Sequence, residues 1–400
     1  MEKQISSQNM NDLKFLLALS FIEDIGPVTT GRLLSAFHTP EAVFSAGVSE
    51  LSSVGEISPL KAKRIKEFKA WGKIEKEIEK AEHHKIRIVT LFDKEYPEPL
   101  SHLDNAPPIL YAKGDLIEED RFALAMVGSR NMSEYGRKIA ADLSYELAST
   151  GLTIVSGMAR GIDTVSHTGA LNAGGRSIAV LGCGLDICYP AENKELMAAL
   201  SRSGCVISEF PLGTPPERKN FPRRNRLISG LSLGVLVVEA TTRSGSLITA
   251  GFALEQGKDI FAVPGNITSG NARGTNGLIK KGAKPVQSAE DIIEELSPQI
   301  KGLLRLVKAA PPSQPQKVCD FSETQAAPAK AFDFSGTQAR GLEINDEEKA
   351  ICNILGSDSK HIDHIVRELK IPAARLSGLL LGLEIKGLVR QTAGNNFSIL

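Results

Sequence analysis

The sequence predicts an α/β protein built on a Rossmann-like parallel sheet with helices on both faces. Six short apolar segments recur between residues 122 and 263, and most are followed by a glycine-containing loop and a helical pattern. These segments are apolar almost throughout rather than alternating, which is typical of parallel strands covered on both faces. The expected strands are Phe122–Val127, Leu152–Val155, Ser177–Leu181, Val206–Ser208, Val235–Val238 and Ile260–Val263.

Residues 1–82 are expected to form a helical module ahead of the sheet. Two glycine turns, Ile25-Gly26-Pro27 and Val54-Gly55, each precede an amphipathic stretch, as in SAM-like and helix-hairpin-helix modules. Such hairpins often place their turn amides on DNA phosphates. Val28, however, stands where a fuller hairpin turn would have a second glycine. A DNA-contacting module and a module that only packs on its neighbour are both consistent with this sequence.

Residues 83–300 carry the sheet, and ligands of such sheets gather beyond the carboxyl ends of the strands. Residues 301–343 are rich in Pro, Ala, Ser and Gln, which predicts a flexible linker. The linker contains a short duplication, Asp320–Ala326 and Asp333–Ala339. A slipped duplication in an unconstrained segment explains this repeat more simply than a peptide-docking motif does.

Residues 344–400 follow the order of a winged helix, in which a helix precedes a helix-turn-helix and a hairpin. The expected helices are Asp346–Leu355, Ile362–Leu369 and Ala373–Lys386, and the expected strands are Leu388–Gln391 and Asn396–Leu400. The third helix carries only Arg375 and Lys386 as bases, with Glu384 opposing them. A protein contact and a weak DNA contact are equally consistent with this domain.

The composition limits the classes of function. The chain has 400 residues and 42% hydrophobic content, enough for two or three domains with full cores. Its 47 basic and 47 acidic residues balance, so any nucleic-acid surface must be a local patch. The five cysteines form no CxxC pair, which argues against a zinc site or a disulfide framework. The early apolar run Phe15–Ile22 is too short to span a bilayer, so we expect a soluble, cytoplasmic protein.

Positive charge is concentrated in one segment. Between residues 218 and 243 one acid, Glu239, accompanies six bases, namely Arg218, Lys219, Arg223, Arg224, Arg226 and Arg243. Three of the arginines lie at the start of a predicted helix that opens with Phe221 and Pro222. Arginine side chains and the free amides of a helix N-terminus together suit an extended polyanion. Phe221 fits either stacking on an unpaired base or a hydrophobic staple at the helix start.

Four loops at expected strand ends have the small residues that let backbone amides face an anion. They are Gly128–Ser133, Ser156–Asp163, Gly182–Gly184 and Thr241–Ser246. Any one of them could be only the tight turn that a strand-to-helix connection needs. Four such loops in one sheet, beside an arginine cluster, favour phosphate binding. None has the spacing of a P-loop or a good dinucleotide fingerprint.

The sequence offers no catalytic constellation and no metal or cofactor site. His167 follows Asp163 on a predicted helix, where a structural role is the simpler interpretation. Asp163 and Asp186 are interpreted as helix caps or loop braces. Glu209 and Glu239 are expected to hold arginines in position through ion pairs.

An ordered series of motifs between about residues 120 and 285 resembles the DNA-processing protein A (DprA/Smf) family. It comprises Gly128–Arg130, Ser156–Asp163, Ala179–Asp186, Ser208–Gly213, Asn220–Leu231, Val237–Ala240, Arg243–Ala250, Ala262–Gly265 and Gly274–Ile279. The resemblance implies a non-enzymatic protein that binds single-stranded DNA, protects it and helps load the RecA recombinase, as in natural transformation. It also implies a homodimer formed through the Rossmann-like domain.

The resemblance and the loops together define the candidate DNA-binding residues. They are Gly128, Ser129, Arg130, Gly157, Arg160, Arg218, Lys219, Phe221, Arg223, Arg224, Asn225, Arg226, Arg243, Ser244, Gly245 and Ser246. The choice between Arg218 and Lys219 as the main phosphate ligand stays open. The rival hypothesis is a hydrolase related to the nucleoside-monophosphate phosphoribohydrolases, whose corresponding loop carries a catalytic glutamate. Thr249 stands at about that place here, and a threonine cannot act as that base.

Overall fold

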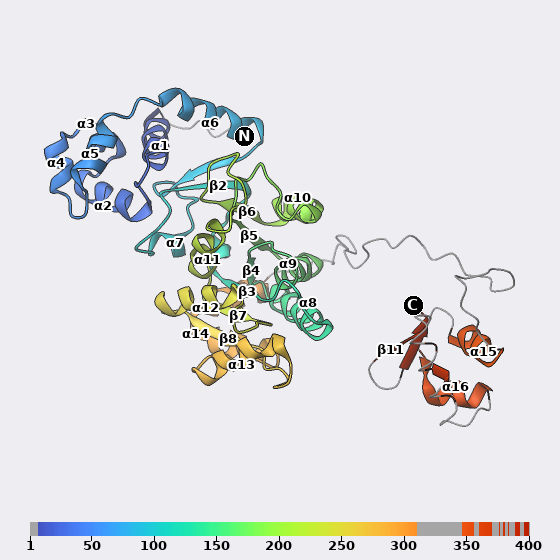
Figure 1. Cartoon of the computed structure of the whole chain (residues 1–400). Coiled ribbons are helices and arrows are strands. Elements are labelled where there is room, and N and C mark those ends of the chain that lie inside the picture. Colours follow the sequence, from blue (N-terminus) through green and yellow to red (C-terminus); the bar gives the residue numbers. More distant parts are fainter. Residues whose placement is uncertain are drawn as a thin grey trace. The chain divides into compact units, whose positions relative to one another are not determined.

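The computed structural model describes residues 7–309 and, toward the C-terminus, residues 346–355, 360–369, 376, 379–380, 383, 389–392 and 396–399. The chain divides into two compact units, one up to Ser322 and one from Glu323 (Figure 1). No helix in the described part of the chain is long and apolar enough to cross a membrane.

The first unit opens with six helices: α1 (Ser7–Ser20), α2 (Pro27–Phe37), α3 (Pro40–Ser45), α4 (Val48–Ser53), α5 (Pro59–Lys66) and α6 (Trp71–His83). Proline occupies the first turn of α2, α3 and α5, where its missing N–H costs no hydrogen bond. Leu33, Leu51 and Ile65 lie in a core within this module. Leu16 of α1 and Ile74 of α6 instead pack with Tyr111 of the sheet, so the module and the sheet share a hydrophobic core.

The two hairpin turns of this module are joined by reciprocal ion pairs. Arg64 of the second hairpin pairs with Asp24 in the first turn, and Arg32 of the first hairpin pairs with Glu56 in the second turn. These pairs hold the two turns together, and a phosphate approaching either turn would meet an arginine as well as a carboxylate.

The central sheet has nine strands in the order β1-β2-β6-β5-β4-β3-β7-β8-β9. Their bounds are Arg87–Thr90, Ile109–Gly114, Ala123–Val127, Thr153–Ser156, Ser177–Leu181, Cys205–Ser208, Gly234–Val237, Asp259–Ala262 and Lys284–Pro285, for β1 to β9. The six expected strands are confirmed to within one residue at each end as β3 to β8. The sheet is not wholly parallel, because β2 runs antiparallel to both β1 and β6.

Helices cover both faces of the sheet, as expected (Figure 1). Ala123, Ala125 and Val127 of β3 face α11 (Asn220–Gly230) and α12 (Ser246–Glu255) in one core. Leu124 and Met126, which point the opposite way along the same strand, lie in the core on the other face. That second face is covered by α8 (Glu134–Ser149), α9 (Ile162–Asn172), α10 (Lys194–Ser203) and α14 (Ala289–Ala309).

Shorter elements complete the first unit: α7 (Glu98–Ser101), α13 (Arg273–Lys280) and the 3₁₀ turns Glu118–Arg121, Ala191–Asn193 and Gly270–Ala272. Helix α14 continues to Ala309, so residues 301–309 are helical where the sequence predicted the start of the linker. The rest of the expected linker, including the Asp320–Ala326 and Asp333–Ala339 repeats, lies outside the described residues.

The second unit has the expected winged-helix elements. Helices α15 (Asp346–Leu355) and α16 (Ile362–Leu369) match their predicted bounds, and β11 (Val389–Thr392) pairs antiparallel with β12 (Asn396–Ile399). A further short strand, β10 (Lys360–His361), adds to β12 and was not predicted. Of the expected helix 373–386, residues 376, 379–380 and 383 are helical, while Arg375, Glu384 and Lys386 lie outside the described residues.

Candidate nucleic-acid interface

A cavity of about 840 Å³ opens at the carboxyl ends of β3, β4 and β7, beside the first turn of α11. We call it the arginine pocket. It brings together ten of the sixteen candidate residues: Gly128, Ser129, Arg130, Arg218, Phe221, Arg224, Asn225, Ser244, Gly245 and Ser246. The other six, Gly157, Arg160, Lys219, Arg223, Arg226 and Arg243, are not part of its lining. The sheet therefore assembles loops that are far apart in sequence into one site, as the strand-end rule predicts.

Phe221 lies in the pocket between charged and aromatic neighbours. The guanidinium carbon of Arg130 is 5.6 Å from the centre of the Phe221 ring, and the ring centre of Tyr189 is 5.7 Å away. A Cβ on Gly182 would come within 2.9 Å of the Phe221 ring, so a glycine is needed there for the ring to adopt this position. The Phe221 side chain stays partly exposed, and 41% of Tyr189 is exposed.

Tyr189 was absent from the candidates predicted by sequence. It follows the Gly182–Gly184 loop, which the sequence did single out, but an isolated tyrosine carries no signal of exposure. Its position next to Phe221 depends on two loops meeting in space, and it widens the aromatic surface of the pocket.

Arg224 forms the buried floor of the pocket. Its Nη1 donates to the carbonyl of Gly157 over 2.7 Å and also to the carbonyl of Val180, and only 4% of the residue is exposed. A Cβ on Gly157 would lie 2.5 Å from this guanidinium, which explains the glycine in that loop. Burial lowers the pKa of Arg224 to about 10, opposed by the nearby Asp163. The side chain therefore remains a fixed positive charge at neutral pH.

Arg226 is directed away from the pocket, although it lies two residues after Arg224. It forms a buried ion pair with Glu209, and its Nη1 donates to the carbonyl of Asn105 over 2.9 Å. Burial lowers the pKa of Arg226 and raises that of Glu209. The expected ion pair of Glu209 with an arginine is confirmed. This arrangement does not favour the expected DNA contact of Arg226, because its guanidinium is enclosed and its charge is already paired.

The remaining candidate cations differ in their exposure and in whether a carboxylate already pairs with them. Arg218 is exposed and lines it, whereas the Lys219 ammonium lies 2.8 Å from Glu217, which favours Arg218 as the phosphate ligand. Arg160 pairs with Glu192, so its charge is compensated outside the pocket. Arg223 is exposed and lies over the ring of Phe210, 5.4 Å from its centre, and Arg243 is exposed.

Asp163 and Asp186 stabilise the strand-end loops by accepting hydrogen bonds from loop backbone groups. The N-cap of α9 and the partner of Glu239 differ from the prediction. Asp186 accepts from the backbone N–H of Gly213 over 2.8 Å, and Asp163 accepts from that of Ala159 over 3.3 Å. The N-cap of α9 is Gly161 rather than Asp163. Within residues 7–309 Glu239 pairs with no arginine; its carboxylate accepts from the backbone N–H and the hydroxyl of Ser133 at the start of α8.

His167 has the structural role that the sequence predicted. Its Nε2 accepts from the backbone N–H of Met158 over 3.3 Å, so Nδ1 carries the proton and donates to the hydroxyl of Ser177 over 2.7 Å. The side chain is fully buried, and burial together with the charge of Arg224 lowers its pKa to about 3. His167 is therefore neutral at physiological pH.

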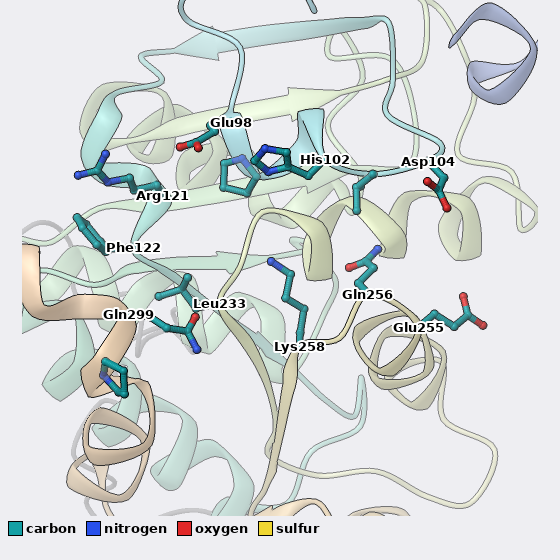
Figure 2. A pocket seen from close by; sticks show the side chains of 13 residues that line it. Glu98, His102, Asp104, Arg121, Phe122, Leu233, Glu255, Gln256, Lys258 and Gln299 are labelled. Atoms are coloured by element: carbon teal, nitrogen blue, oxygen red, sulfur yellow. The ribbon is translucent and has the colours of Figure 1, made fainter. Parts of the chain in front are cut away.

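A separate cavity of about 750 Å³ lies at the opposite edge of the sheet, where β3, β7 and β8 begin. Figure 2 shows Lys258 reaching into it, with Asp104 and Glu255 to one side. The lining holds two bases, Lys258 and Arg121, and the carboxylates of Glu98, Asp104 and Glu255, so it has no excess of positive charge. None of the candidate DNA-binding residues lines this cavity.

Three family models match the chain. DNA recombination-mediator protein A matches residues 87–297, a SAM-like helix-hairpin-helix tandem matches residues 15–68, and the DprA winged helix domain matches residues 325–395. The first of these models covers the whole of the central sheet.

Relatives and a solved structure agree with the models. Protein Smf of Synechocystis is 32% identical over 399 residues, covering 96% of this chain and 98% of the relative. Protein Smf of Escherichia coli is 48% identical over 220 residues, which are 55% of this chain and 58% of that protein, less than two thirds of its length. The X-ray structure of DNA processing protein A from Streptococcus pneumoniae matches with a TM-score of 0.61 and 34% identity, covering 73% of this chain and 99% of that one. The chain therefore belongs to the DNA recombination-mediator protein A (DprA/Smf) family.

Proposed function

We propose that the chain binds single-stranded DNA in the arginine pocket and acts as a recombination mediator. The observation that carries this proposal is the combination of three arginines with two partly exposed aromatic rings in one cavity. Arg224 supplies a charge that cannot move, while Arg130 and Arg218 are exposed and can reach phosphates. Unpaired bases offer faces on which aromatic side chains stack, whereas duplex bases are already stacked on one another.

The loops around the pocket support phosphate binding without base reading. Gly128, Ser129, Gly245 and Ser246 line the pocket with small side chains, which leaves room for a phosphate beside the loop backbone. Phosphate contacts fix the position of a strand but carry no sequence information. Binding through these groups and through Phe221 is therefore nearly independent of sequence.

The wider role is proposed from the family. Bound along such pockets, a strand would be shielded from nucleases, and the chain would help load the RecA recombinase on it in the cytoplasm. We also propose a homodimer through the Rossmann-like domain, because two pockets side by side would lengthen the track for the strand. We propose no catalytic reaction on the bound strand. Thr249, at the place of the hydrolase glutamate, is buried and lacks an ionisable group.

The experiment is fluorescence anisotropy with a labelled oligo-dT and the corresponding duplex at two salt concentrations. We expect the wild type to prefer the single strand and to bind it more weakly at the higher salt concentration. Arg130→Ala and Phe221→Ala should each weaken this binding. Arg137→Ala is the matched control, because Arg137 is an exposed arginine that pairs with Glu134 on α8, outside the pocket. Equal binding of single strand and duplex would contradict the proposal and turn attention to nucleotide ligands and the hydrolase alternative.

A further inference from the structure

A second cavity opens at the carboxyl edge of the sheet, with a volume of about 450 Å³. We call it the glutamate pocket, after the carboxylate of Glu239 in its lining. It lies where β7 and β8 end and where α8 begins. Strand β3 has β4 on one side and β7 on the other, so the order of the strands reverses between β3 and β7, next to this pocket. Such a switch point is where ligands of open α/β sheets bind.

The glutamate pocket and the arginine pocket are neighbours. Asn131 and Asn271 line the arginine pocket, and Ser133 and Ala272, one or two residues further along the chain, line the glutamate pocket. The wall between the two is closed by a hydrogen bond of 3.1 Å from Nδ2 of Asn271 to the carbonyl of Asn131. A strand bound in the arginine pocket therefore has a second cavity beside it.

Glu239 is a buried carboxylate with unused hydrogen-bonding capacity. Only 5% of the residue is exposed, and among residues 7–309 no lysine or arginine forms an ion pair with it. One oxygen accepts from the backbone N–H of Ser133 over 2.9 Å, and the other accepts from the Ser133 hydroxyl. A carboxylate offers about four acceptor positions, so each oxygen can accept one further bond. Gly136 is required for this arrangement, because a Cβ there would collide with the carboxylate.

The chemistry of the lining selects a particular base. Val238, Val263 and Ala272 give apolar walls that suit the faces of a flat ring. Besides their bonds from Ser133, the two oxygens of Glu239 can accept two parallel N–H bonds, and guanine presents such a pair on its Watson–Crick edge, at N1 and at the exocyclic N2. Adenine and cytosine place an acceptor beside their amino group on that edge, and thymine places carbonyls on both sides of its N–H.

Building on the proposed function, we propose that the glutamate pocket takes a guanine base of the bound strand, with Glu239 accepting from N1 and N2. The phosphate and stacking contacts of the arginine pocket remain independent of sequence. The glutamate pocket adds a base preference at one position of the strand.

The test compares an oligo-dT strand of about 20 nucleotides with the same strand carrying one central guanine, inosine or adenine. Competition anisotropy measures the four affinities. The guanine strand should bind about five- to tenfold more tightly than oligo-dT. Inosine lacks the N2 amino group and should lose most of this gain, and adenine should give none. Equal affinities of the four strands would overturn the inference, while the affinity for oligo-dT itself tests the proposed function separately.

Two variants locate the preference. Glu239→Gln keeps the size of the side chain but replaces one acceptor by a donor, so the guanine preference should disappear while oligo-dT still binds. Because Glu239 also anchors the start of α8, a second variant leaves it in place: Ser269→Trp puts a large ring on the lining of the pocket. Thr268→Trp is the matched control, since Thr268 is exposed and outside the lining. A preference that survives in Ser269→Trp, or that Thr268→Trp abolishes equally, would contradict the proposed site.

Discussion

Two groups of arginines in this molecule differ in what surrounds them. Arg130 and Arg218 are exposed at the arginine pocket, with their guanidinium groups open to a ligand. Arg224 and Arg226 are buried, with 4% and 6% of each residue exposed, and donate to backbone carbonyls or to Glu209. The first group can exchange water for phosphate. The second holds α11 and the strand-end loops in place, and Arg224 also fixes a positive charge at the floor of the pocket, so the candidate arginines divide between ligand binding and architecture.

The largest effect should come from the buried group. Arg226→Ala would leave Glu209 buried without its partner, and we expect the free energy of unfolding to fall by about 3–5 kcal/mol. Urea denaturation followed by circular dichroism measures this change. The double substitution Arg226→Met with Glu209→Leu should cost much less, because no unpaired charge remains. A loss below about 1 kcal/mol for Arg226→Ala would show that the ion pair has no such structural role.

The next effect concerns the aromatic part of the arginine pocket. Phe221→Ala should weaken binding of oligo-dT by about 5- to 150-fold, which corresponds to about 1–3 kcal/mol for one base stacked on the ring. The salt dependence should stay unchanged, because no charge is removed. Phe92→Ala is the control, since Phe92 is an exposed aromatic residue outside the pocket lining. Equal binding by Phe221→Ala and the wild type would favour the helix-start staple as the role of this ring.

A smaller effect concerns the pH dependence of the free energy of unfolding, to which the buried His167 contributes. The folded-state pKa of His167 is lowered from 6.5 to about 3, so its stabilising contribution is present above pH 6.5 and is lost as the pH falls toward 3. Between pH 6 and 5 it should contribute about 1.4 kcal/mol per pH unit to the fall in stability. His167→Gln removes this titrating group, so the stability of the variant should depend less steeply on pH. Urea midpoints at several pH values measure both slopes, and parallel slopes would contradict the assignment of a neutral, buried His167.

The fold of the central domain could be predicted from sequence because its parallel strands are apolar on both faces. Strands β3 to β8 have this pattern, and so were found to within a residue. Strand β1 (Arg87–Thr90) is short and begins with a charged residue, and β2 follows Pro107 and Pro108. Strand β1, at the edge of the sheet, lacks the continuous apolar signal, and the antiparallel pairing of β2 with β1 and β6 depends on contacts distant in sequence.

The candidate site could be predicted only in part. The residue types of the Phe221–Arg226 segment predicted a polyanion site, but successive residues of a helix differ by about 100° in direction. Arg223 is therefore exposed and Arg224 buried, although no feature of the sequence distinguishes them. Which arginine faces the pocket depends on how α11 packs on the sheet, and the same packing places Tyr189 beside Phe221.

The most direct test of the account is the salt dependence of oligo-dT binding in single arginine variants. Arg130→Ala and Arg218→Ala should each lower the slope of log affinity against log salt by about 0.7, the share of one phosphate contact on a single strand. Their unfolding free energies should stay within about 0.5 kcal/mol of the wild type, and Arg137→Ala should change neither quantity. Slopes that match the wild type in both pocket variants would contradict the central claim that the exposed arginines of this pocket hold the strand.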